Sequence, residues 1–110
     1  MQAIEYDLIV TIVGKGWADE IVEASRKAGA EGGTIIYGRG TGIHEQKNFL
    51  GLVIEPEKEI VLTVINKTKT KQVLDAIVKA GKLEQPGTGI AFVTSLDKVA
   101  GIVHLENLPK

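Results

Sequence analysis

Two continuous runs of aliphatic and β-branched residues stand out along the chain, one in each half. The first covers residues 7–13 and the second covers residues 59–65. Runs of this kind are typical of strands that are buried on both faces. Each is followed by a stretch with apolar residues at helical spacing, which ends at Gly29 or Gly81. The pattern therefore predicts a strand and then a helix in each half.

A second strand is expected after each helix, over residues 34–37 and residues 90–93. Gly29 is expected to provide a left-handed C-cap for the first helix. Asn66 or Thr68 can cap the start of the second helix. The inward faces are formed by Ala18, Ile21, Val22, Ser25 and Ala28 in the first helix, and by Val73, Leu74, Ile77 and Val78 in the second. Residues 102–105 can add a short edge strand.

The two halves also align with each other. When the sequence is shifted by 52 positions, residues 7–29 fall on residues 59–81 without a gap, with six identities among 23 pairs. The chain thus predicts a duplicated βαβ unit in an α+β, ferredoxin-like domain over residues 1–110. Two helices would cover one face of a four-stranded antiparallel sheet. The other face has no helix, so its apolar strands are expected to be buried against another subunit.

Composition excludes several classes of function. Cysteine is absent, which excludes disulfides, thiolate chemistry and cysteine-ligated zinc. The net charge is −1 and no long run of one sign occurs, so no nucleic-acid partner is expected. No apolar run approaches the roughly 20 residues of a membrane span. The start of the chain lacks the features of a signal peptide. We therefore expect a cytoplasmic protein that is not inserted in a membrane.

Glycine gathers in two places, residues 38–42 and residues 81–89, and each contains a Gly-Thr-Gly triplet. Glycine lets a ligand approach the backbone closely, so that its N–H groups can bind an anion. Ordinary turns are the alternative for either cluster alone. Neither cluster fits a P-loop or a dinucleotide-binding motif. Because the triplets occur at equivalent places in the two halves, we interpret them as a ligand site.

No constellation for catalysis or metal binding is evident. His44-Glu45 begins like a zinc motif, but Asn48 stands where the second histidine would be required. Neither Ser25 nor Ser95 is linked to a histidine-carboxylate pattern. We therefore expect no enzyme, no metal and no required cofactor. The polar segment 43–50 is expected to be a mobile functional loop between the halves.

These features together resemble the PII signal-transduction proteins over nearly the whole chain. The resemblance rests on Gly33-Thr34-Ile35-Ile36, Arg39-Gly40-Thr41-Gly42, Ala80-Gly81-Lys82-Leu83, Gly87-Thr88-Gly89-Ile90-Ala91-Phe92-Val93 and Asp97-Lys98-Val99. It implies a homotrimer that binds an adenine nucleotide (AMP, ADP or ATP) as effector in clefts between subunits. It also implies control of a membrane transporter or an enzyme, commonly in nitrogen metabolism, through a projecting loop called the T-loop. The implied ligand-binding residues are Thr34, Arg39, Gly40, Thr41, Gly42, Lys82, Gly87, Thr88 and Gly89. The implied partner-binding residues are His44, Glu45, Gln46, Lys47 and Asn48.

The chain departs from the family pattern in its loop and in its charges. The segment between Gly42 and Gly51 is much shorter than a full T-loop and has no tyrosine for uridylylation. Cations that bind phosphates in the family fall on Ile90, Gly101 and Val103. We therefore expect AMP or ADP to bind at least as well as ATP, because charge-assisted contacts are the strong ones. The alternatives are a CutA-like or purely structural trimer without nucleotide, and a small ferredoxin-like enzyme.

Overall fold

The computed structural model describes residues 4–40, 47–49, 52–54 and 56–101. Its elements in chain order are β1 (Tyr6–Gly14), α1 (Ala18–Lys27), β2 (Thr34–Arg39), β3 (Lys47–Phe49), β4 (Leu52–Ile54), β5 (Glu57–Asn66), the 3₁₀ turn η1 (Lys67–Lys69), α2 (Thr70–Gly81) and β6 (Gly89–Leu96). Each strand predicted from an apolar run is present and extends beyond that run. The additional edge strand expected at residues 102–105 lies outside the described residues.

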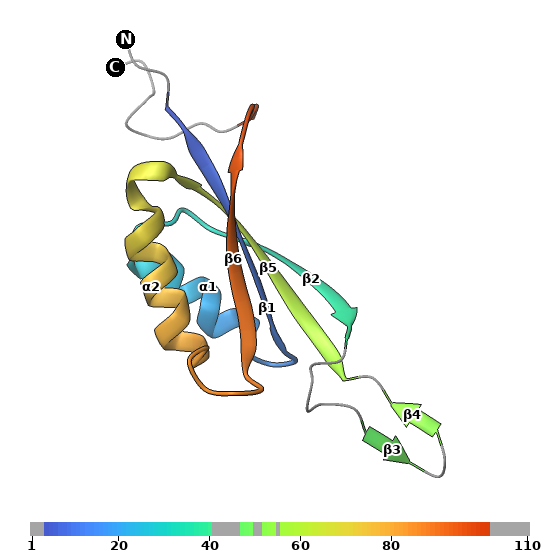
Figure 1. Ribbon diagram of the computed structural model, residues 1–110. Coiled ribbons are helices and arrows are strands. Elements are labelled where there is room, and N and C mark those ends of the chain that lie inside the picture. Colours follow the sequence, from blue (N-terminus) through green and yellow to red (C-terminus); the bar gives the residue numbers. More distant parts are fainter. Residues whose placement is uncertain (1–3, 41–46, 50–51, 55, 102–110) are drawn as a thin grey trace.

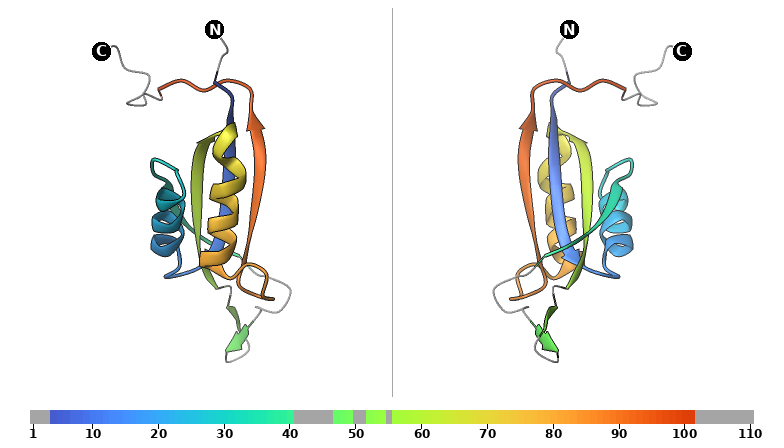
Figure 2. Two further views of the ribbon diagram at one scale, coloured as in Figure 1. Left: turned by 90° about the vertical axis from the view of Figure 1, so that its left-hand side faces the viewer. Right: turned by 90° about the vertical axis from the view of Figure 1, so that its right-hand side faces the viewer.

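β1, β2, β5 and β6 form one sheet in the order β2-β5-β1-β6, in which every pair is antiparallel. The register places Val10 of β1 opposite Leu62 of β5 and Phe92 of β6. Both helices lie on one face of this sheet, as the views in Figures 1 and 2 show, and they pack on each other. This confirms the α+β, ferredoxin-like arrangement predicted from the duplication.

The core lies between the sheet and the helices. Ile9 and Val13 of β1 are 0% and 1% exposed, and Ile21 of α1 and Ile77 of α2 pack against them. Val10 and Ile12, which alternate with the buried residues of β1 and face the other side of the sheet, are only half-buried. β1 and β5 thus have their fully buried apolar residues on one face only, which differs from the prediction of burial on both faces. The reason is that no described element of the chain covers the second face.

This second face, which we call the open face, is apolar. Ile36 on β2, Val64 on β5, and Ile90 and Phe92 on β6 are 42–55% exposed. The register puts all four side chains on the same face of the sheet. Contiguous apolar surface of this kind marks a place where a protein meets a partner.

A carboxylate from the second half of the chain holds the start of α1. Glu59 on β5 is 8% exposed, and its Oε1 accepts hydrogen bonds from the N–H groups of Gly16 (2.6 Å) and Ala18 (3.1 Å). N–H groups at the start of a helix have no partner within it, and the helix dipole favours negative charge there. Glu59 therefore caps α1 in place of the N-cap residue Trp17, whose side chain makes no capping bond.

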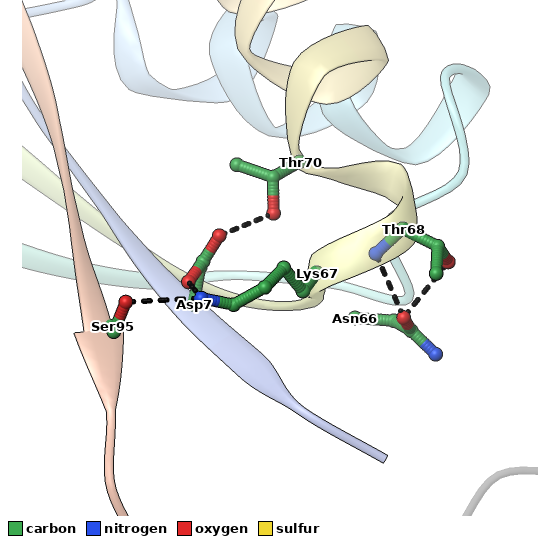
Figure 3. A network of polar contacts seen from close by, with 6 residues as sticks. All are labelled: Asp7, Asn66, Lys67, Thr68, Thr70 and Ser95. Carbon is green, nitrogen blue, oxygen red and sulfur yellow. Dashed lines mark hydrogen bonds and ion pairs between the residues drawn. The ribbon is translucent and has the colours of Figure 1, made fainter. Parts of the chain in front are cut away.

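A carboxylate from the first half holds the start of α2 (Figure 3). Asp7 on β1 is 6% exposed; its Oδ2 accepts from the Thr70 hydroxyl at 2.8 Å, and its Oδ1 lies 3.2 Å from Lys67 Nζ. Lys67 Nζ also donates to Ser95 Oγ at 3.0 Å. Burial by itself raises the pKa of the Asp7 carboxyl, but the Thr70 and Lys67 contacts more than offset it, so that this pKa lies below its usual range. The network joins β1, β6 and the start of α2.

Of the two predicted helix caps, Gly29 follows α1 as expected, whereas Asn66 caps the 3₁₀ turn η1. The N-cap residue of α2 is Lys69, which makes no side-chain capping bond. The Asn66 side-chain oxygen accepts from the Thr68 N–H at 3.0 Å and from the Thr68 hydroxyl at 2.8 Å (Figure 3). Gly29, after α1, has a φ of 123°. A side chain at this φ is strained, which explains glycine at the end of α1.

The segment between β2 and β5 differs in part from the predicted loop. β3 and β4 pair with each other, with Asn48 opposite Val53, and form a small separate sheet. This hairpin projects beyond the end of the four-stranded sheet (Figure 1). Lys47 and Asn48 therefore lie in a strand. The Leu-Val-Ile sequence of residues 52–54 has high strand propensity and supplies the partner that the prediction missed. Residues 43–46 and 50 lie outside the described residues.

We expect Asp7→Asn to lower the free energy of unfolding by about 1–3 kcal/mol at pH 7, because charge-assisted bonds of a buried group are lost. A carboxylate with a depressed folded-state pKa stabilises the fold above its unfolded pKa, and this stabilisation is lost as the pH falls through the folded pKa. In urea unfolding, the difference between the wild type and the variant should therefore shrink below about pH 4.

Asp75→Asn is the matched control. Asp75 pairs with Lys71 at 3.0 Å, but its side chain is 65% exposed, so its loss should change stability by no more than about 0.5 kcal/mol. Equal losses for the two variants would contradict the structural role of Asp7.

Candidate functional site

The two glycine-rich segments lie at the same end of the sheet but on opposite edges. Gly38, on edge strand β2, is opposite Lys58, which is opposite Gly14. Val13, the residue before Gly14 on β1, is opposite Gly89 on the other edge strand, β6. We call this the glycine end of the sheet. The edges are three strand spacings apart, about 14 Å. Within one chain, the two glycine-rich segments are therefore not immediate neighbours.

The first segment begins where β2 ends. Arg39 is the last residue of β2 and is exposed. The Gly40 N–H donates to the Pro56 carbonyl at 3.2 Å, which extends the pairing of the two chain segments by one residue. Thr34 lies at the other end of β2, about 17 Å along the strand from Arg39. Of the remaining predicted site residues here, Thr41 and Gly42 lie outside the described residues, as do His44, Glu45 and Gln46.

The second segment is a tight loop that connects α2 to β6. The Leu83 N–H donates to the Val78 carbonyl at 3.0 Å, and the Gln85 N–H donates to the Lys82 carbonyl at 3.0 Å. The Thr88 hydroxyl lies 2.7 Å from the Lys82 carbonyl and 3.0 Å from the Gln85 carbonyl. Thr88, predicted as a ligand contact, thus donates its hydroxyl proton within the loop and stabilises the loop conformation.

The backbone conformation at positions 87 and 89 requires glycine. Gly87 has a φ of 80° and is surrounded by open space, whereas Gly89 has a φ of 151° and its added Cβ would clash with the Ile12 carbonyl oxygen. Exposed backbone at Gly87 is open to a ligand. Gly89 instead allows β6 to start close against β1.

Lys82 adopts a conformation that glycine would adopt more easily. α2 ends at Gly81 as predicted, but the left-handed residue is Lys82, with a φ of 52°. A Cβ at Gly81 would lie 3.0 Å from Ile21 Cδ1 and 3.1 Å from Leu83 Cδ2. Gly81 is therefore needed for packing, and Lys82 carries the strain of the turn. Its side chain lines a hollow of about 420 Å³ together with Asp75 and others beside α2.

The structure adds residues beside Arg39 that the sequence analysis missed. Lys15, in the turn after β1, forms an ion pair with Glu57 at 2.8 Å, and Glu57 lies opposite Arg39 in the sheet. This pair raises the pKa of Lys15 and lowers the pKa of Glu57. Only the pairing of β2 with β5 brings these residues together, and no local motif reveals it. Within the described part of the chain, no group of three or more histidine, aspartate or glutamate residues could hold a metal ion.

Comparison with known proteins gives a family and a fold. The family model for nitrogen regulatory protein P-II matches residues 6–104. Among curated proteins, none matches this sequence. Among solved structures, a Bacillus cereus protein related to NIF3 is similar with a TM-score of 0.67 and 24% sequence identity. The similarity covers 89% of this chain but only 27% of that protein, so it supports the fold alone. No helix in the described ranges has the length and apolar character needed to cross a bilayer.

We expect Lys82→Gly to raise the free energy of unfolding by about 0.5–1 kcal/mol, because glycine relieves the left-handed strain. Lys79→Gly is the matched control: Lys79 lies in the last turn of α2, where glycine should cost about 1 kcal/mol. Urea unfolding of both variants gives the comparison. A loss of stability in Lys82→Gly equal to that in Lys79→Gly would show that the turn imposes no such strain.

Proposed function

The chain belongs to the nitrogen regulatory protein P-II family, and on this premise we propose that it is a PII-like signalling protein of the cytoplasm. It binds an adenine nucleotide as a small effector in clefts between the subunits of a homotrimer. It then regulates a transporter or an enzyme, in nitrogen metabolism. Proteins of this family are regulators that form trimers and act on target proteins.

The observation that carries this proposal is the placement of the two glycine-rich segments. They lie on opposite edges of the sheet and at the same end of it. If copies of the chain meet around their open faces, the β2 edge of one copy approaches the β6 edge of the next. Such an assembly brings Arg39 and Gly40 of one subunit near Lys82 and Gly87 of its neighbour. It also buries the apolar side chains of the open face.

The charges near these segments favour a ligand with few phosphates. Arg39 and Lys82 are exposed cations that can bind an anionic group. Ile90, at the start of β6, stands where the family has a phosphate-binding lysine, and it is 55% exposed. An apolar side chain there offers nothing to a terminal phosphate. AMP and ADP therefore fit this site at least as well as ATP.

The segment between the two halves is the proposed output of the signal. It begins next to Gly40, so a ligand bound there can change its order, and a target protein can recognise that change. β3 places Lys47 and Asn48 in the hairpin that projects beyond the sheet (Figure 1). A projecting element is accessible to a transporter or an enzyme.

We expect AMP and ADP to raise the melting temperature of the protein, because a ligand that binds only the folded state stabilises it. Gly87→Val should abolish the shift, and Gly16→Val is the matched control. Gly16 also has a positive φ, of 98°, and open space around it, so the two variants carry similar strain. Sedimentation equilibrium should show a trimer for the wild type and for both variants.

A monomeric wild type would contradict the proposed assembly. A stable trimer that no adenine nucleotide stabilises would support the alternative, a CutA-like or structural module. A strong preference for ATP would show that the loss of the cation at Ile90 is compensated elsewhere.

We expect the replacement of residues 44–48 by a Gly-Ser linker to abolish target capture while the trimer remains intact. Nucleotide affinity should change by no more than about threefold, since only ordering of the loop is lost. Capture of the target from native lysate, wild type against variant, gives the measurement. Equal recovery of the same target would place the output on another surface.

A further inference from the structure

A hollow lies at the glycine end of the sheet, beside the end of edge strand β2. Its volume is about 610 Å³. Four of the residues that line it form what we call the Tyr37 corner: Lys15, Tyr37, Arg39 and Glu57. Gly38 and Lys58 complete the lining. The volume is within the range of small-molecule sites. Hollows along α1 and beside α2 have nearly balanced charges, whereas this lining has an excess of cations.

Among the residues that the structure describes, none is a counter-ion for Arg39. Arg39 and Glu57 are directly opposite each other in the β2–β5 pair, where an ion pair between them would be expected. Glu57 instead binds Lys15 at 2.8 Å. Among the described residues, no other carboxylate pairs with the Arg39 guanidinium. A guanidinium in this position can bind an oxyanion through two parallel hydrogen bonds.

Tyr37 adds an aromatic surface to these cations. Its position two residues before Arg39 places both side chains on the same side of β2. Tyr37 is 74% exposed, the highest value among the exposed large apolar residues. Lys15 lines the same hollow as Tyr37 and Arg39. An exposed ring beside two cations is suited to a ligand that is flat at one end and anionic at the other.

We propose that the Tyr37 corner binds a small planar oxyanion, a molecule with a phosphate or carboxylate attached directly to a flat ring. The ring stacks on Tyr37, and the anionic group binds the Arg39 guanidinium and the Lys15 ammonium. An adenine nucleotide fits less well, because ribose separates its ring from its phosphate. This inference goes beyond the proposed function: Lys15 and Tyr37 are not part of the nucleotide site, and Arg39 is the one shared residue.

Glu57 sets the strength of this site. Its carboxylate competes with the ligand for Lys15, since both bind the same ammonium group. Removal of the Glu57 charge should therefore strengthen binding, which is the opposite of what the loss of a supporting residue would do. The site is also exposed, so affinity should fall as salt is added.

Titrations of the full chain at low ionic strength, followed by NMR chemical shifts, test the proposal. Phenyl phosphate should bind about three to ten times more tightly than inorganic phosphate, because a stacked aromatic pair contributes about this factor. Benzoate against acetate gives the same comparison for a carboxylate and shows which anion the site prefers. If neither ring-bearing anion binds more tightly than its ring-free counterpart, the proposal is wrong.

Variants assign the binding to these residues. Tyr37→Ala should remove the advantage of the ring, and Tyr37→Phe should keep it. Lys15→Gln should weaken binding severalfold, whereas Glu57→Gln should strengthen it severalfold. Lys27→Gln is the matched control, since Lys27 also pairs with a glutamate and has a similarly exposed side chain. Equal effects of Lys15→Gln and Lys27→Gln, or weaker binding in Glu57→Gln, would overturn the assignment.

The two sites can be tested separately. Gly87→Val should leave phenyl phosphate affinity unchanged, and Lys15→Gln should leave the AMP-induced melting shift unchanged. Failure of the Tyr37 corner is thus distinguishable from failure of the nucleotide site. Loss of both responses in Lys15→Gln would show that there is one site and would overturn the proposal of a separate corner.

Discussion

Two buried carboxylates hold the halves of this domain together in a crossed arrangement. Asp7 and Glu59 occupy equivalent positions when the sequence is shifted by 52. Asp7, in the first half, binds Thr70 and Lys67 at the start of α2, and Glu59, in the second half, binds Gly16 and Ala18 at the start of α1. A buried carboxylate without partners is costly. Neither half can satisfy its own carboxylate, so each depends on the other for its helix start.

The same contacts determine the geometry of the glycine end. Glu59 lies in the row of the sheet that contains Tyr37 and Gly89, and it fixes the turn that precedes α1. Lys15 belongs to that turn and reaches Glu57, two residues before Glu59 on β5. The position of the Tyr37 corner therefore follows from a capping interaction. The hydrogen bonds that start α1 thus also position the proposed anion site.

Local patterns in the sequence predicted the four strands of the main sheet, both helices and the glycine after α1, because apolar spacing and capping residues act over a few positions. The corner around Lys15 and Tyr37 depends on the pairing of β2 with β5, which no local pattern contains. Thr88 stays a predicted ligand contact, and the structure adds that its hydroxyl donates a hydrogen bond within its own loop. The triplet pattern located the two loops. The role of each residue within them depends on backbone bonds that the pattern does not show.

The open face links stability to function in the proposed assembly. Ile36, Ile90 and Phe92 are exposed in a single chain, and in the proposed assembly neighbouring copies bury them. The contact that buries them also brings the β2 and β6 edges of adjacent copies together and thereby completes the proposed nucleotide site. Any ligand that binds across those edges stabilises the assembly by mass action. In such an arrangement, effector binding and subunit association reinforce each other, because they share one interface.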